Sequence, residues 1–166
     1  MWRKDSIMKL LFWNTYRNNK INQYLDSLVR DYNIDILITA EYSADENELN
    51  TFLEKCHQHL FKCNTFGCDR IDVWSNYAKV EAGIQNRYYS IQVIQKNIIL
   101  CCVHLVSDSY GDYSNERLAI IQEIVNEIKT KQDDIQSQYV IIMGDINEMP
   151  YDKGCLSANG FHGLPA

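Results

Sequence analysis

The chain has 166 residues, of which 46% are hydrophobic and 23% charged, a composition typical of one globular domain. Its formal net charge of −6 argues against an extensive basic face for non-specific nucleic-acid binding. No apolar run approaches the roughly 20 residues that span a bilayer, and the N-terminus lacks the apolar core and cleavage site of a secretory signal, so we expect a cytoplasmic or nuclear protein.

Strands and helices are expected to alternate at both ends of the chain, around a β-rich centre. In chain order we expect a strand at residues 9–13, a helix at 19–32, a strand at 35–40, a helix at 43–59, strands at 71–75, 88–94 and 98–105, a helix at 114–131 and a strand at 139–143. Ser114 is expected to cap the helix at 114–131. This order favours one domain over residues 1–166, a layered α/β sandwich with a mixed sheet.

The six cysteines give one alternative function, zinc binding. Four potential ligands follow one another in a Cys-x2-His-x3-Cys-x4-Cys series: Cys56, His59, Cys63 and Cys68. Because this spacing matches no established zinc pattern, zinc ranks third among the functions considered. Cys101 and Cys102 lie inside an apolar run, where a thiol behaves as a small core residue.

Polar residues follow four of the predicted strands at the point where each strand ends. They are Asn14, Glu41, His104, and Asp145 together with Asn147. Taken singly, each fits a turn or a solvated surface position. Ligands of open α/β sheets collect at strand ends, however, and carboxylate and amide oxygens suit Mg²⁺ or Mn²⁺. The joint occurrence therefore predicts a divalent-metal site.

The same residues carry a resemblance to a known family. Trp13-Asn14, Glu41, Val103-His104-Leu105 and Gly144-Asp145-Ile146-Asn147 occur in the order seen in the endonuclease/exonuclease/phosphatase superfamily, which the chain resembles from residue 9 to about residue 152. Arg117 and Gln122 resemble the Arg-containing helix of that superfamily. The resemblance implies a DNase I-like, four-layered α/β sandwich. It also implies a metal-dependent phosphoester hydrolase acting on a nucleic acid, a nucleotide or a phospholipid head group.

The resemblance also implies a role for each residue. Glu41 would be the main carboxylate ligand of Mg²⁺ or Mn²⁺, with Asn14 beside it. Asp145 would orient or deprotonate the attacking water, and Asn147 would hold the phosphate or the metal. His104 would donate a hydrogen bond to the scissile phosphate, and Arg117 would bind or orient phosphate. Such groups stabilise the charge that builds on the phosphate oxygens during hydrolysis.

The chain departs from the superfamily in lacking its terminal Ser-Asp-His motif, since none of the four histidines follows an aspartate. His162, in Gly160-Phe161-His162-Gly163-Leu164, resembles an internal loop instead. We therefore expect an incomplete domain, truncated at its C-terminus, with mainly the first sheet and its helices. It would be inactive alone, and it would self-associate through an uncovered sheet face.

Two alternatives stay open beside a truncated enzyme. The chain could be a naturally short relative that has lost activity or takes its second half from a partner. It could also be a non-catalytic module that binds metal or phosphate, or supports assembly, on the same fold.

Overall fold

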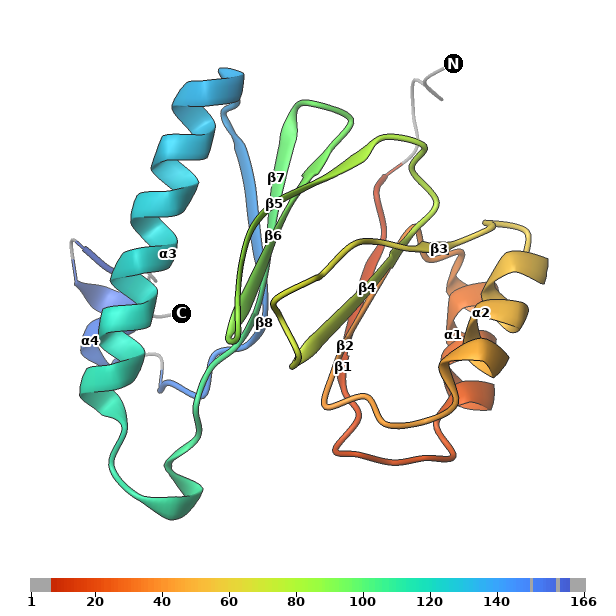
Figure 1. Cartoon of the computed structure of the whole chain (residues 1–166), viewed down its shortest axis with the longest axis horizontal. Coiled ribbons are helices and arrows are strands. Elements are labelled where there is room, and N and C mark those ends of the chain that lie inside the picture. The colour runs from red at the N-terminus through yellow and green to blue at the C-terminus, as the bar shows by residue number, and fades with distance from the viewer. Residues whose placement is uncertain (1–6, 150, 158, 162–166) are drawn as a thin grey trace.

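A computed structural model describes residues 7–149, 151–157 and 159–161, and His162 lies outside them. The elements form four layers (Figure 1): α1 and α2, a first sheet, a second sheet, then α3 and α4. The helices are α1 (Asn22–Tyr32), α2 (Glu46–Lys55), α3 (Ser114–Ile135) and the short α4 (Lys153–Leu156). A 3₁₀ turn, η1 (Asp108–Tyr110), precedes α3.

Each sheet has four strands. The first has the order β1-β2-β4-β3, from β1 (Leu10–Asn14), β2 (Ile36–Ala40), β4 (Ile71–Ser75) and β3 (Phe61–Lys62). The second has the order β5-β6-β7-β8, from β5 (Val80–Asn86), β6 (Tyr89–Ile94), β7 (Ile98–His104) and β8 (Tyr139–Asp145). In each sheet one edge pair is parallel, β1 with β2 and β7 with β8, and the other pairs are antiparallel.

The parallel pairs determine where the strand ends lie. A parallel pair needs a crossover connection, which α1 supplies between β1 and β2 and α3 supplies between β7 and β8. The last residues of paired strands are therefore neighbours: Asn14 lies beside Ala40, and His104 lies beside Asp145. Each sheet presents two strand tips at one edge.

Apolar clusters join the four layers. Trp74 belongs to the cluster that packs α1 and α2 against the first sheet. Ile38 and Leu100 belong to the cluster between the sheets, and Val103 and Ile121 to the cluster that packs α3 against the second sheet. β2 is buried along its whole length because it has a helix layer on one face and the second sheet on the other.

The helix boundaries follow from local chemistry. α1 ends at Asn33, which has φ +53° and donates its backbone N–H to the carbonyls of Val29 and Arg30, a left-handed C-cap. The Asp45 side chain accepts from the backbone N–H groups of Asn47 and Glu48 and so begins α2.

The α/β class and the incomplete four-layered sandwich are confirmed, with both sheets present rather than mainly the first. Each sheet covers the other's inner face, so the uncovered face that we expected is not seen among the described residues. Half-exposed apolar residues lie instead on the edge strands β1 and β8. No helix in the described part of the chain is long and apolar enough to cross a membrane.

Some local expectations were wrong. The helix expected at residues 43–59 is shorter, and β3 and β5 were not predicted. β5 contains Gly83 and is largely exposed, so it shows no clean alternation of apolar residues. Ser114 does not cap α3: its hydroxyl donates to Asp112 at 2.7 Å, and the N-cap position is Tyr113.

Candidate functional site

The predicted strand-tip residues come together at one edge of the sandwich, from both sheets. Asn14 ends β1 and Glu41 follows β2 in the first sheet, whereas His104 and Asp145 end β7 and β8 in the second. The Asn14 amide donates from Nδ2 to Asp145 Oδ2 at 2.9 Å, between residues 131 positions apart in the sequence. His104 Nε2 lies 3.5 Å from Glu41 Oε1. These two contacts bridge the sheets.

Glu41 occupies a constrained backbone position at the end of β2. Its φ is +51°, in the left-handed region that a residue with a side chain seldom adopts. Its backbone N–H donates to Arg70 O at 3.3 Å, and its carbonyl accepts from Arg17 N–H at 3.1 Å. Such backbone strain persists only where surrounding contacts hold it, and it concentrates at functional sites.

Asn147 lies in the same cluster and also has a φ of +51°. Its backbone N–H donates to Asp145 Oδ1 at 3.2 Å, and its side-chain Nδ2 donates to Leu105 O at 2.9 Å. The Asn147 amide nitrogen is therefore engaged in holding the chain just after His104. Its side-chain oxygen and the second N–H of its amide are left to face a ligand.

His104 is 5% exposed and carries an unusual polar atom. Burial lowers the pKa of its imidazole, and the charge of Arg70 lowers it further, against the opposing effect of Asp145 and Glu41. The buried Nδ1 has no hydrogen-bond partner among the described residues. A buried ring nitrogen without a partner costs free energy, and five other buried side-chain atoms of the described residues are in the same position.

The donor set at this edge fits a hard divalent cation. The side chain of Glu41 is 27% exposed, and no described residue approaches its carboxylate more closely than His104, at 3.5 Å. Asn14 Oδ1 accepts one backbone N–H, from Tyr16, and retains a second lone pair. Mg²⁺ typically takes one or two carboxylates and fills its remaining positions with water and substrate oxygens. Glu41 and Asn14 would supply such a partial set.

Arg117 is a buried side chain whose guanidinium is engaged by two carboxylates beside the cluster. Its side chain is 3% exposed and that of Glu148 is 2% exposed, with Arg117 Nε 2.8 Å from Glu148 Oε1. Asp108 accepts from both terminal nitrogens, at 2.7 and 2.8 Å. The ion pair with Arg117 lowers the pKa of Asp108 to about 2. Arg117 therefore joins the loop after β7 to the loop after β8, and an orienting role through these loops stays a prediction.

Comparison with known proteins concerns the fold. No protein-family model and no curated protein sequence matches the chain. Solved structures do match. D. rerio TDP2 in complex with a single-strand DNA product has 18% identity and a TM-score of 0.65, over 98% of this chain and 67% of that chain. Beta toxin from Staphylococcus aureus with bound magnesium ions has 18% identity and a TM-score of 0.62, over 91% and 69%.

A third match is the 3′ phosphatase NExo from Neisseria bound to a product DNA hairpin, with 16% identity and a TM-score of 0.60 over 91% of this chain and 62% of that one. The chain has a DNase I-like fold. It spans about two thirds of the length of these structures, so its sandwich is an incomplete one.

Three residues beside the strand-tip cluster were not predicted as site residues: Arg17, Arg70 and Tyr88. Arg17 Nε lies 3.8 Å from Glu41 Oε2. Arg70 precedes β4, and its guanidinium stacks on the ring of Tyr88, 4.9 Å from the ring centroid. No motif or spacing in the sequence marks these residues. The pairing of β4 with β2 and the packing of the two sheets bring them to the site.

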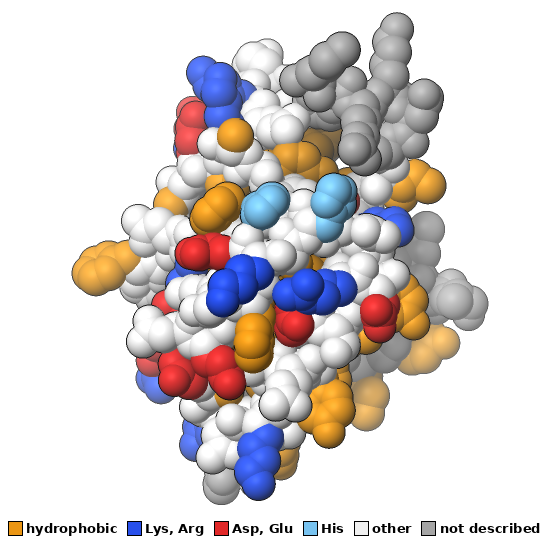
Figure 2. All heavy atoms as spheres, turned by 90° about the vertical axis from the view of Figure 1, so that its right-hand side faces the viewer, with side chains coloured by type: hydrophobic (Ala, Val, Ile, Leu, Met, Phe, Trp, Pro, Cys, Tyr) orange, Lys and Arg blue, Asp and Glu red, His pale blue; other side chains and the backbone are white. Residues whose placement is uncertain are grey.

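The zinc alternative is wrong for the described part of the chain. No group of three or more His, Cys, Asp or Glu side chains there is arranged to hold a metal ion. Cys56 is fully buried and its thiol donates to Leu53 O, whereas His59 is exposed. Figure 2 shows the outer face of the α1 and α2 layer, where acidic and basic side chains are interspersed. The same finding applies to Glu41, His104 and Asp145 at the strand-tip cluster, so a metal there is a proposal that rests on Glu41 together with the Asn14 amide, which this criterion does not count.

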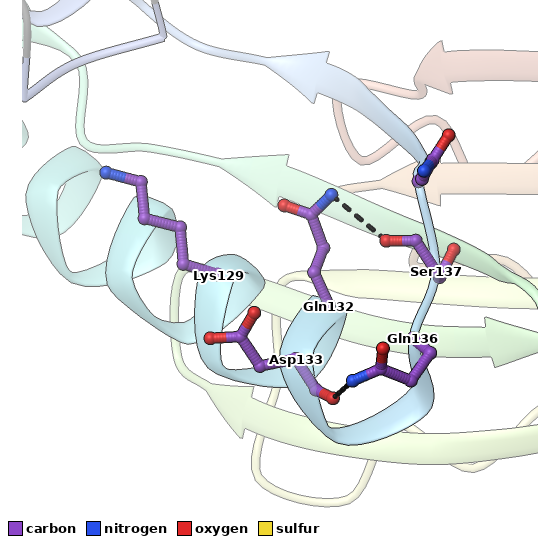
Figure 3. A pocket seen from close by; sticks show the side chains of 6 residues that line it. Lys129, Gln132, Asp133, Gln136 and Ser137 are labelled. Atoms are coloured by element: carbon purple, nitrogen blue, oxygen red, sulfur yellow. Dashed lines mark hydrogen bonds between the residues drawn. The ribbon is translucent and has the colours of Figure 1, made fainter.

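A hollow elsewhere on the surface lies far along the second sheet from the site. It is lined at the C-terminal end of α3 by residues that include Lys129, Gln132 and Ser137 (Figure 3). Gln132 Nε2 donates to Ser137 O at 3.3 Å within it. Ser137 precedes the first residue of β8, whereas Asp145 is the last, so this hollow contributes nothing to the strand-tip cluster.

Proposed function

We propose that the strand-tip cluster is the site of a divalent-metal-dependent phosphoester hydrolase. The observation that carries this proposal is the meeting of oxygen ligands and a buried imidazole from both sheets, fixed by the bond between Asn14 and Asp145 at 2.9 Å. The DNase I-like fold supports it, because the matched structures include a phosphatase bound to DNA and a toxin with bound magnesium ions.

Each residue has a role that its surroundings support. Glu41 and Asn14 would hold Mg²⁺ or Mn²⁺, which on binding supplies positive charge to polarise a phosphate oxygen. Asp145 is held by Asn14 and by the Asn147 backbone, so its carboxylate is oriented to accept a proton from water. His104, whose imidazole pKa is lowered by burial, would donate one N–H to a phosphate oxygen.

The substrate class that we propose is a phosphate ester of a nucleic acid, a nucleotide or a phospholipid head group. A cytoplasmic location belongs to the same proposal, since it rests on the sequence alone. The assays below test the substrate class, with one soluble ester and one nucleic acid.

A second candidate is a non-catalytic module that binds metal and phosphate. The observation that favours the module is the number of histidines at the cluster: in the part of the chain that the structure describes, His104 alone lies there. His57 and His59 lie in the connection between α2 and β3. A hydrolase needs a second proton-transfer group to protonate the leaving oxygen, and the described residues offer no imidazole for that step.

Turnover and metal binding should be measured together on this chain. Bis-p-nitrophenyl phosphate and plasmid DNA are the substrates, with Mg²⁺ or Mn²⁺, in the presence and absence of added imidazole. Imidazole in solution replaces a missing proton-transfer group. Since we expect the chain to be inactive alone, turnover should require both metal and added imidazole. Glu41→Gln should lose at least about a hundredfold of that turnover, equivalent to about 2.7 kcal/mol of transition-state stabilisation.

Glu54→Gln is the matched control, because Glu54 is exposed on α2. It should leave turnover and metal affinity unchanged. Saturable Mn²⁺ binding by calorimetry, lost in Glu41→Gln and accompanied by no turnover even with imidazole, would establish the binding module instead. If Mn²⁺ binds neither protein and no substrate is hydrolysed, both proposals fail.

A further inference from the structure

The phosphate of a substrate needs a cationic partner, and Arg117 is already engaged. Its guanidinium is buried against Asp108 and Glu148, and to release it would leave a buried carboxylate unpaired, which costs several kcal/mol. The other arginines near the cluster therefore decide where a phosphate would bind. They are Arg17, Arg70 and Arg87.

Arg70 is placed at the cluster by its backbone. It directly precedes β4, whose first residue pairs with Ala40 at the end of β2. The Arg70 carbonyl accepts the backbone N–H of Glu41 at 3.3 Å. Because β2 and β4 are adjacent strands, Arg70 is a cross-strand neighbour of the proposed metal ligand.

Its side chain extends from the first sheet to the second. The guanidinium carbon lies 4.9 Å from the centroid of the Tyr88 ring, within the range of a cation–π interaction. The Tyr88 carbonyl accepts the backbone N–H of His104 at 2.8 Å. The positive charge of Arg70 also lowers the pKa of His104. The guanidinium therefore lies on the His104 side of the cluster.

Within the part of the chain that the structure describes, Arg70 differs from Arg17 and Arg87 in having no anionic partner. Arg17 lies 3.8 Å from Glu41 and is 82% exposed, and Arg87 lies 3.9 Å from Asp69 and is 62% exposed. Arg70 is half-buried, yet its guanidinium makes no ion pair and no hydrogen bond with any other described residue. The group lies over the Tyr88 ring, and no acceptor among the described residues takes its N–H groups.

We propose that Arg70 binds the phosphate group of the ligand at the strand-tip cluster, an inference that rests on the proposed function. A planar guanidinium donates two parallel hydrogen bonds to two oxygens of one phosphate, and these charge-assisted bonds are stronger than neutral ones. Tyr88 is the positioning residue: its hydroxyl donates to Glu116 Oε1 at 3.0 Å, which fixes the ring on which Arg70 stacks.

The test is binding of inorganic phosphate to the chain, followed by the NMR signal of the arginine Nε–H groups and assigned with the Arg70→Lys variant. The Arg70 signal should shift saturably with phosphate. Loss of a hydrogen bond to a charged group predicts that Arg70→Gln weakens phosphate binding about tenfold to a hundredfold. Arg70→Lys should retain part of the affinity, because it keeps the charge but not the planar pair of donors.

Arg30→Gln is the matched control, since it removes the same charge from α1, where Arg30 pairs with Asp26. Its phosphate affinity should stay within about twofold of that of the unmodified chain, as expected for an exposed pair. Tyr88→Leu should weaken binding and Tyr88→Phe should not weaken it as far, because phenylalanine keeps the ring. Backbone amide spectra of each variant show whether it is folded.

Two results would overturn the inference: phosphate affinity equal in Arg70→Gln and the unmodified chain, or no saturable phosphate binding to the unmodified chain. These results are separable from failure of the proposed function. Phosphate binding that depends on Arg70, without metal-dependent turnover, would support the binding site and remove the hydrolase. Turnover that depends on Glu41, with phosphate affinity unaffected in Arg70→Gln, would support the hydrolase and remove the Arg70 phosphate site.

Discussion

Replacing Gly144 with alanine should destabilise the chain at the point where β8 leads into Asp145. Gly144 has φ +152°, a backbone conformation that residues with a side chain rarely adopt. A Cβ added there would lie 1.9 Å from the carbonyl oxygen of Val103 and 2.8 Å from its backbone nitrogen. Both atoms belong to the main chain of the adjacent strand β7, so no side-chain rotation relieves the contact.

The magnitude follows from two costs. Holding a residue with a side chain in this region costs about 1–3 kcal/mol, and forcing an extra carbon into a packed position costs about 1–3 kcal/mol. Because the strands relax partly, we expect a loss of about 3 kcal/mol in the free energy of unfolding. For a domain of this size that corresponds to a fall in Tm of roughly 6–12 °C.

Urea unfolding followed by circular dichroism measures the change. Gly111→Ala is the control, because Gly111 has an extended φ of 161° and its added Cβ would meet only the Tyr113 ring, at 3.5 Å. It should change stability by less than about 0.5 kcal/mol. Equal stability of Gly144→Ala and Gly111→Ala would refute the argument that β7 and β8 approach too closely for any side chain at position 144.

Three further predictions concern the contacts outside the cluster. Arg117→Met should lower the free energy of unfolding in urea by about 3 kcal/mol or more, because it leaves the buried Glu148 carboxylate unpaired. A loss no greater than that caused by removing an exposed ion pair would contradict this prediction. The pKa of Asp108 is about 2 instead of 3.8. The contribution of Asp108 to stability is therefore present above pH 3.8 and is lost as the pH falls through about 2. In Arg117→Met, carboxyl NMR should show that the pKa of Asp108 rises. The half-exposed edges β1 and β8 should make the chain self-associate, and a monomer by light scattering at high concentration would rule this out.

Apolar patterning identified the strands that are buried on both faces. Ile36–Ala40 and Ile98–His104 were predicted as strands because residues buried on both faces form a continuous apolar run. β5 was missed because it is an edge strand with most of its residues partly or fully exposed. For the same reason the sequence did not show that the second sheet has four strands.

The residues of the candidate site also divide into those that the sequence could predict and those that it could not. Asn14, Glu41, His104 and Asp145 could be proposed from the sequence because each directly follows or ends an apolar run, and strand ends are where ligands collect. Arg70 could not, since it follows an aspartate in a loop and has no pattern of its own. Only the pairing of β4 with β2 and the position of Tyr88 in the facing sheet bring it beside His104.

By itself, then, the sequence determined which residues end the strands, because local hydrophobic periodicity decides where a strand stops. The Gly-Asp-x-Asn segment, the alternation of strands and helices, and hence the class of fold are local properties of this kind. Tertiary structure alone decided which cations are free. Arg117 has the expected residue type at the expected place, yet Asp108 before its helix and Glu148 after β8 neutralise it, whereas Arg70 has no ion-pair partner among the described residues. Whether a charge faces a ligand depends on partners brought from distant segments, and no local pattern records them.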